Sequence, residues 1–99
     1  MYVYLFKNEN TYKIGVSKNP HKRIKQLQTG NGNRIKLVSV FESKFPTKLE
    51  KILHNIYKIN RTVGEWFLLD TSIEQKFITE CSNIENSLIT LQKLGNTFI

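Results

Sequence analysis

The pattern of apolar and polar positions at the start of the chain predicts a β-hairpin. Positions 2–6 and 11–16 are rich in aromatic and β-branched residues, with a short polar turn between them. Two such runs joined by a few polar residues are typical of antiparallel strands. A third run, 35–41, follows a breaker cluster of glycine and asparagine at 29–33 and is expected to form a third strand. Its side chains expected to face the core are Ile35, Leu37 and Phe41.

Two segments have the pattern of amphipathic helices. A proline that follows cap-type residues favours a first helix over residues 20–28. A second helix is predicted from Pro46 to about Ile59, because its apolar side chains fall at positions i, i+3, i+4 and i+7. This stripe consists of Leu49, Ile52, Leu53 and Ile56.

The last third of the chain predicts a short extended segment and then a long helix. The extended segment covers 65–69, and the helix follows over about 72–91. Thr71 and Glu74 have the spacing of a capping box at the start of this helix. The elements together predict an α+β fold, in which a small mixed or antiparallel three-stranded sheet is flanked by helices in the order β-β-α-β-α-(β)-α. We expect residues 1–99 to form one domain, with the last helix packed on it.

Composition fits one small globular domain. The 99 residues are 39% hydrophobic and 11% aromatic, which is enough for one core. The single cysteine, Cys81, excludes a disulfide framework and a cysteine-based zinc site. The apolar runs are too short to span a membrane, and no signal-peptide segment follows Met1. We therefore expect a soluble intracellular protein, in the cytoplasm or nucleus of a host cell.

Charge is divided unevenly along the chain. Residues 1–61 hold 13 Lys and Arg against 3 acids, a net charge of +10, whereas residues 62–99 hold 2 against 5, a net charge of −3. A basic segment of this kind favours a polyanionic partner, with nucleic acid first; a lysine-rich solvated surface is the alternative. The cations expected to contact phosphates are Lys18, Lys22, Lys25 and Arg34.

One face of the second predicted helix carries candidate chemistry. Glu50, His54 and Tyr57 lie at i, i+4 and i+7, so a carboxylate and an imidazole can meet one ligand or each other. The alternatives are a salt-bridged surface glutamate and a packed or solvated histidine. Tyr2 and Tyr4 share one strand face, where core packing is the usual reason for an aromatic side chain.

Taken in chain order, a set of short motifs resembles the GIY-YIG nuclease superfamily. The set consists of Tyr2-Val3-Tyr4, Lys13-Ile14-Gly15, Arg23, the Glu50 and His54 pair, and Gly64-Glu65-Trp66-Phe67. The Lys-Ile-Gly form and the Gly-Glu-Trp-Phe ending look most like the short single-domain branch of phages, large DNA viruses and fungal meiotic proteins. The motifs lie within residues 2–69, with Gly15 and Trp66 as structural motif positions.

The resemblance implies hydrolysis of DNA phosphodiester bonds with one divalent metal ion, Mg²⁺ or Mn²⁺. By this resemblance Glu50 binds the metal, and Arg23 stabilises charge on the scissile phosphate. Tyr4 matches the tyrosine that orients or deprotonates the attacking water, which for deprotonation needs positive charge nearby. Lys13 is a catalytic candidate where the wider superfamily has a tyrosine, and His54 is a site member as proton carrier or ligand partner.

Three functions remain open at this stage. The leading one is a metal-dependent DNA endonuclease. Its rival is a catalytically silent DNA-binding module on the same basic surface, favoured by the missing second tyrosine. The third is a protein-interaction domain that uses the last helix, if Phe77, Ile78, Ile89 and Phe98 are partly exposed. Homodimerisation through that helix would supply the second active site that a double-strand cut requires.

Overall fold

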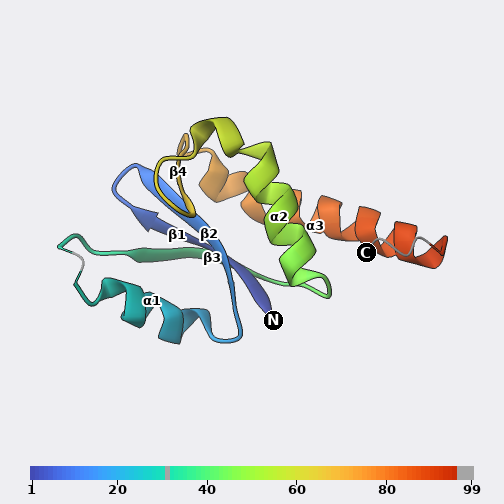
Figure 1. The fold of residues 1–99 in the computed structure, drawn as a ribbon, viewed down its shortest axis with the longest axis horizontal. Helices are drawn as coiled ribbons and strands as arrows, with labels where there is room; N and C mark the ends of the chain where they lie inside the picture. Colours follow the sequence, from blue (N-terminus) through green and yellow to red (C-terminus); the bar gives the residue numbers. More distant parts are fainter. Residues whose placement is uncertain (31, 96–99) are drawn as a thin grey trace.

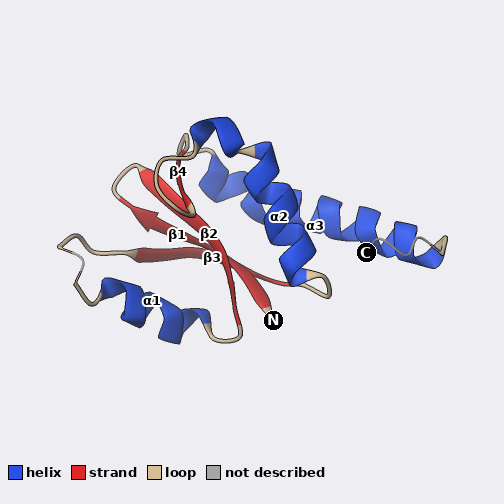
Figure 2. Cartoon of the chain, in the orientation of Figure 1, coloured by secondary structure: helices blue, strands red, loops and turns tan. Residues whose placement is uncertain are grey.

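The hairpin at the start of the chain forms the centre of an antiparallel sheet (Figures 1 and 2). The computed structural model describes residues 1–30 and 32–95, and within them the sheet has four strands in the order β3-β1-β2-β4. The strands are β1 (Tyr2–Asn8), β2 (Thr11–Ser17), β3 (Lys36–Glu42) and β4 (Trp66–Leu68). The short extended segment predicted over 65–69 therefore forms an edge strand that pairs with β2. The α+β class is confirmed, and β4 raises the expected three strands to four.

The helices begin where the sequence predicts them. They are α1 (Pro20–Gln28), α2 (Pro46–Ile56), the 3-10 helix η1 (Lys58–Asn60) and α3 (Ile73–Lys93). Asn19 caps α1, since its side-chain oxygen accepts a hydrogen bond from the backbone N–H of Lys22 at 3.1 Å. The second helix ends earlier than expected, because its last predicted turn tightens into η1.

Both faces of the sheet carry a core. Val3 and Leu5 of β1 join the cluster that α2 and α3 cover, whereas Tyr4 and Phe6 join a second cluster with Ile35 on the opposite face. Figure 1 shows α1 on one side of the sheet and α2 with α3 on the other. Successive strand residues point to opposite faces. The continuous apolar run of β1 therefore fills two cores.

A β-bulge changes the orientation of β3 partway along its length. Leu5 pairs with Ser39, but the next residue, Phe6, pairs with Leu37. The extra residue reverses the alternation of side chains. Ile35 and Leu37 consequently pack on the α1 side, as expected, whereas Phe41 packs on the opposite core. All three side chains pack on a core, as expected, but the bulge divides them between the two faces of the sheet.

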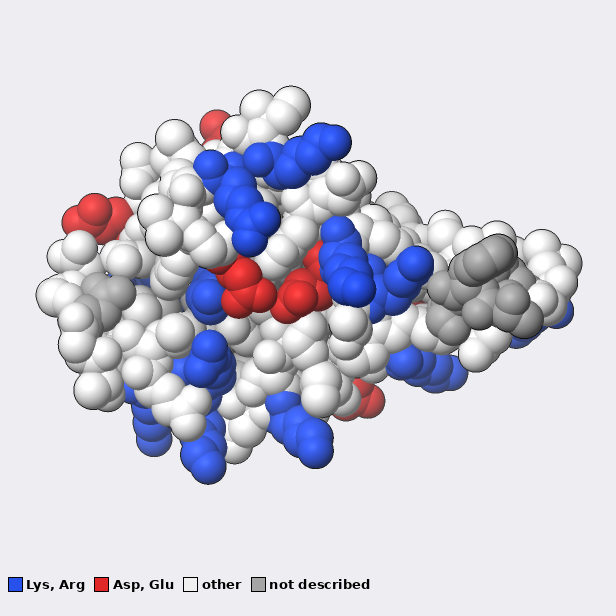
Figure 3. All heavy atoms as spheres, in the orientation of Figure 1, with Lys and Arg blue, Asp and Glu red and all other residues white. Residues whose placement is uncertain are grey.

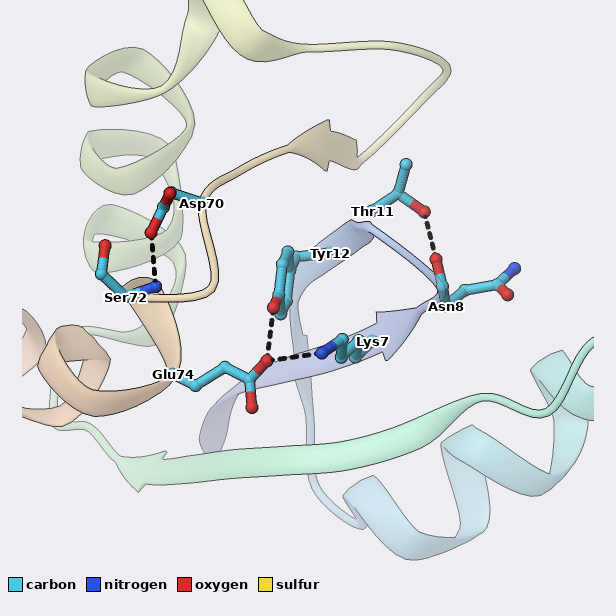
Figure 4. Close-up of polar contacts among 7 residues, drawn as sticks. All are labelled: Lys7, Asn8, Thr11, Tyr12, Asp70, Ser72 and Glu74. Carbon is cyan, nitrogen blue, oxygen red and sulfur yellow. Dashed lines mark hydrogen bonds and ion pairs between the residues drawn. The ribbon is translucent and has the colours of Figure 1, made fainter.

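The start of α3 is held by the hairpin rather than by a capping box. The Glu74 carboxylate accepts a hydrogen bond from the Tyr12 hydroxyl and forms an ion pair with Lys7, whose Nζ lies 2.8 Å from Glu74 Oε2 (Figure 4). Asp70 accepts one from the backbone N–H of Ser72 at 2.8 Å. The predicted capping box was therefore wrong, because a tertiary contact takes the carboxylate that would cap the helix.

The outer surface of α3 is less apolar than expected. Phe77 is fully buried, so its expected exposure was wrong, while Ile78 is exposed and Ile89 half-buried. Phe98 lies outside the described residues. Among residues 1–30 and 32–95, no helix is both long and apolar enough to cross a membrane.

Candidate active site

The candidate site residues meet along the edge of β2, next to its pairing with β4. β4 pairs with Thr11, Tyr12 and Lys13. At the next residue, Ile14, the backbone N–H donates to the carbonyl of Glu65 at 3.4 Å, and its own carbonyl accepts a hydrogen bond from α2. On the face in Figure 3, acidic side chains gather near the centre and Lys and Arg side chains surround them.

Three side chains of the types that bind metal ions lie close together here. Glu50 and His54 come from α2, and Glu65 comes from the turn that precedes β4. One ligand atom of each side chain lies within 4.8 Å of the other two, and all three residues are half-buried. The helical spacing predicted the first two members. Glu65 was missed as a ligand, although its place in the Gly-Glu-Trp-Phe motif was a signal for it.

His54 is held in one orientation by the sheet. Its Nε2 lies 2.7 Å from the Ile14 carbonyl oxygen, and its ring meets the Phe67 ring edge-on with centroids 5.0 Å apart. A carbonyl oxygen can only accept, so Nε2 carries the proton in this contact. The ring nitrogen that keeps its lone pair is then Nδ1. Metal-bound histidines are commonly fixed in this way by a backbone carbonyl.

Negative charge in this cluster is not fully compensated by the protein. Burial, and next the charge of Glu65, raise the pKa of the Glu50 carboxyl above its usual value. Positive charge nearby, from His54 when it is protonated and from Lys13, acts in the opposite direction but does not reverse the shift. Two carboxylates and an imidazole nitrogen at this separation therefore fit a divalent cation in donor type and in charge.

Tyr4 occupies the other side of the site and stays protonated at neutral pH. Its ring is buried, stacks on Phe6 with centroids 3.9 Å apart, and lies against Gly15, its cross-strand partner. Burial raises the pKa of the Tyr4 hydroxyl, and the neighbouring Arg23 only partly offsets it. Of the two roles that the resemblance implies, orienting a water molecule therefore fits this side chain better than deprotonating one.

Lys13 is part of the site as an ion-pair partner. Its ammonium lies 3.0 Å from a Glu65 carboxylate oxygen and 5.6 Å from the centre of the Trp66 ring. The side chain is only 9% exposed. A cation of the protein itself is thus already held against the carboxylate cluster.

The cations expected to contact nucleic acid lie on and beside α1. Lys18, Lys22, Lys25 and Arg34 are all exposed. Lys25 and Arg34 also line one open cavity of about 430 Å³, with Ile24 and Ile35 among its apolar walls. Tyr57, the third member of the helix pattern, is not in the site, because its hydroxyl donates to Glu80 of α3.

Comparison with known proteins identifies one family. A family model described as the T5orf172 domain matches residues 1–85. The matched span contains the whole sheet and every candidate site residue, from Tyr4 to Trp66. No curated protein and no solved structure matches the chain.

Proposed function

We propose, from the premise that the chain belongs to the T5orf172 domain family, that it is a metal-dependent endonuclease that hydrolyses phosphodiester bonds of DNA. That family is nuclease-related and GIY-YIG-like in fold. One observation carries the proposal. Tyr4, Arg23, Glu50, His54 and Glu65 come from separate parts of the chain and converge at one sheet edge. The charges of both glutamates act on the Tyr4 hydroxyl, which links the two halves of the site.

The carboxylates and the imidazole of the cluster are the groups that would hold the cation, Mg²⁺ or Mn²⁺. Glu50 contributes from α2, His54 from the next turn of that helix, and Glu65 from across the sheet edge. A divalent ion held there supplies Lewis acidity towards a phosphoryl oxygen. The protein keeps the two carboxylates partly desolvated, which strengthens their attraction for a cation.

The remaining site residues act on water and phosphate. The protonated Tyr4 hydroxyl can hold a water molecule by a hydrogen bond, and its buried, stacked ring fixes where that bond points. Arg23, beside it, presents a planar guanidinium that can bind two phosphate oxygens. Lys13 contributes further positive charge between Glu65 and Trp66. Phosphoryl transfer needs such fixed positive charge where negative charge accumulates.

DNA would approach along α1. Lys18 and Lys22 are exposed on or beside its first turn, and Lys25 with Arg34 lines the cavity at its far end. Contacts of this kind place the phosphodiester backbone without reading its sequence. Residues 1–30 and 32–95 hold one such site, so a single copy is expected to nick, and a duplex cut is expected to need two copies.

A catalytically silent DNA-binding module is the second candidate. It is favoured by the Lys13 and Glu65 ion pair, because an internal cation already neutralises one of the carboxylates. The same basic surface would then bind DNA without cutting it.

Supercoiled plasmid at low salt separates these candidates. We expect wild-type protein to convert it to the nicked form with Mg²⁺ or Mn²⁺ and not with EDTA. The matched variants are Glu50→Gln in the site and Glu42→Gln on the exposed end of β3. Nicking should be lost in the first and retained in the second. Gel-shift binding without nicking, under both metals, would establish the silent module instead.

A further inference from the structure

We propose that the cluster of Glu50, His54 and Glu65 selects a divalent first-row transition-metal ion over Mg²⁺, with the Nδ1 atom of His54 as the discriminating donor. The inference deepens the proposed function and rests on it for the presence of a cation in the reaction. It concerns which ion the residues choose, which can be measured without DNA.

The separation of the ligand atoms suits one ion. One oxygen of each glutamate and one ring nitrogen of His54 lie within 4.8 Å of one another. Two donors on one cation, with bonds of about 2.1 Å, are at most about 4.2 Å apart. Three donors spread around one such ion lie roughly 3–3.6 Å apart, so a closure of roughly 1–2 Å brings all three onto it. Side-chain rotation of glutamate supplies such a movement without a change in the backbone.

The third donor is a nitrogen, and its orientation is set in advance. The Ile14 carbonyl takes the Nε2 proton of His54 at 2.7 Å, and the Phe67 ring packs against the imidazole. The lone pair at Nδ1 is thereby kept on a fixed ring. Imidazole suits transition metals, whereas Mg²⁺ takes oxygen ligands and keeps several of its waters. His54 is consequently expected to strengthen the binding of transition metals far more than that of Mg²⁺.

The ion pair with Lys13 increases this difference. Lys13 lies 3.0 Å from one oxygen of Glu65, so a metal ion must share that carboxylate with an ammonium group. An ion that binds through oxygen alone then meets one full carboxylate and one partly neutralised carboxylate. An ion that also bonds to the His54 nitrogen keeps a third strong contact, so it binds more tightly than an ion that uses oxygen ligands alone.

Isothermal titration of the full chain with Co²⁺, Mn²⁺ and Mg²⁺, in the absence of DNA, tests the selectivity. Wild type should bind Co²⁺ more tightly than Mn²⁺, and Mn²⁺ at least about tenfold more tightly than Mg²⁺. His54→Gln replaces the ring with an amide and should bring Mn²⁺ and Mg²⁺ to within about threefold of each other. His21→Gln, at the chain's other histidine, on the exposed face of α1, should behave as wild type. Equal affinities for Mn²⁺ and Mg²⁺ in wild type would overturn the inference.

A spectroscopic measurement on wild type covers the case in which His54→Gln unfolds. Electron spin-echo spectra of bound Mn²⁺ should show coupling to a ¹⁴N nucleus, which changes when the histidines are labelled with ¹⁵N and persists in His21→Gln. Bound Mn²⁺ without nitrogen coupling contradicts the inference. Plasmid nicking is scored separately. Nitrogen-bound Mn²⁺ without nicking would contradict the proposed function and support the metal preference. Nicking with Mg²⁺ and no nitrogen coupling would support the proposed function and contradict the metal preference.

Discussion

Gly15 and Tyr4 face each other across the central hairpin so closely that glycine is the only residue that fits. A Cβ atom on Gly15 would lie within 3.0 Å of three atoms of the Tyr4 side chain, including its hydroxyl oxygen. The glycine of the second motif is therefore required by space rather than by backbone conformation. It allows the Tyr4 ring to lie flat across β2 with its hydroxyl beside Arg23.

Gly15→Ala should consequently displace Tyr4. We expect a loss of about 1–3 kcal/mol in the free energy of unfolding, because an inserted methyl group overpacks the core. Nicking should fall at least tenfold, since the hydroxyl moves away from the site. Urea titration and plasmid assays measure the two effects. Gly32→Ala is the control, because its added Cβ meets open space within the described part of the chain.

Glu50→Gln should separate stability from function. Burial and Glu65 raise the pKa of Glu50, so ionisation of this carboxyl opposes folding above its unfolded pKa. A neutral amide avoids that cost, and the metal-free variant should melt at a higher temperature than wild type at pH 7. Added Mn²⁺ should raise the melting temperature of wild type and not of the variant. A lower melting temperature for the metal-free variant would contradict the electrostatic account of the site.

Glu74→Gln should destabilise the protein without changing its chemistry. The hydrogen bonds from Lys7 and Tyr12 lower the pKa of Glu74, so its contribution is present at neutral pH and is lost as the pH falls through that pKa. We expect a cost of about 1 kcal/mol at pH 7, where the pair is partly exposed. The difference from wild type should shrink as the pH is lowered towards 3. Chemical denaturation at both pH values checks this, and a constant difference would argue against the assignment.

Triple replacement of Lys18, Lys22 and Lys25 by alanine should weaken DNA binding and flatten its salt dependence. Each phosphate contact contributes about 0.9 to the slope of log affinity against log salt, so three contacts contribute roughly 2.7. Lys76→Ala with Lys93→Ala, on α3, is the control and should leave the slope unchanged. Fluorescence anisotropy across a salt series measures the slopes. Equal slopes for the triple variant and wild type would place the DNA elsewhere.

Local signals predicted most of the fold. The first helix was predicted with its observed bounds, because proline marks its start and a glycine-rich stretch follows its end. The stripe on α2 predicted the burial of Leu49 and Leu53, which are fully covered, but not the exposure of Ile56 at its end, which is 50% exposed. The β3 bulge was not predictable, since it depends on how Leu5 and Phe6 pair with a distant strand.

The candidate site was predicted only in part, because local spacing reveals contacts within one helix and not contacts between distant segments. Glu50 and His54 share one helix, so their meeting follows from helical spacing alone. Glu65 joins them only because β4 pairs with β2, which is a long-range contact with no periodic signature. Glu74 shows the converse: its local spacing suits a cap, but Lys7 and Tyr12 offer it stronger partners from the sheet.

Arg23→Lys distinguishes an enzyme from a module that only binds. If the domain only binds DNA, the variant keeps the charge and should behave as wild type. In the proposed reaction the guanidinium contacts the scissile phosphate through two parallel donors, which an ammonium group cannot reproduce. Loss of a group that stabilises a transition state costs about 2.7–4 kcal/mol, or roughly a hundredfold to a thousandfold in rate.

Because lysine retains part of that stabilisation, we expect single-turnover cleavage to fall at least about tenfold in Arg23→Lys, with little change in the dissociation constant for DNA. Both must be measured at one salt concentration, since binding depends on salt. The conservative change Lys22→Arg, on the exposed neighbour of Arg23, controls for altered charge geometry on α1. Parallel losses of binding and cleavage would make Arg23 an ordinary phosphate anchor, and cleavage equal to that of wild type would remove it from the reaction.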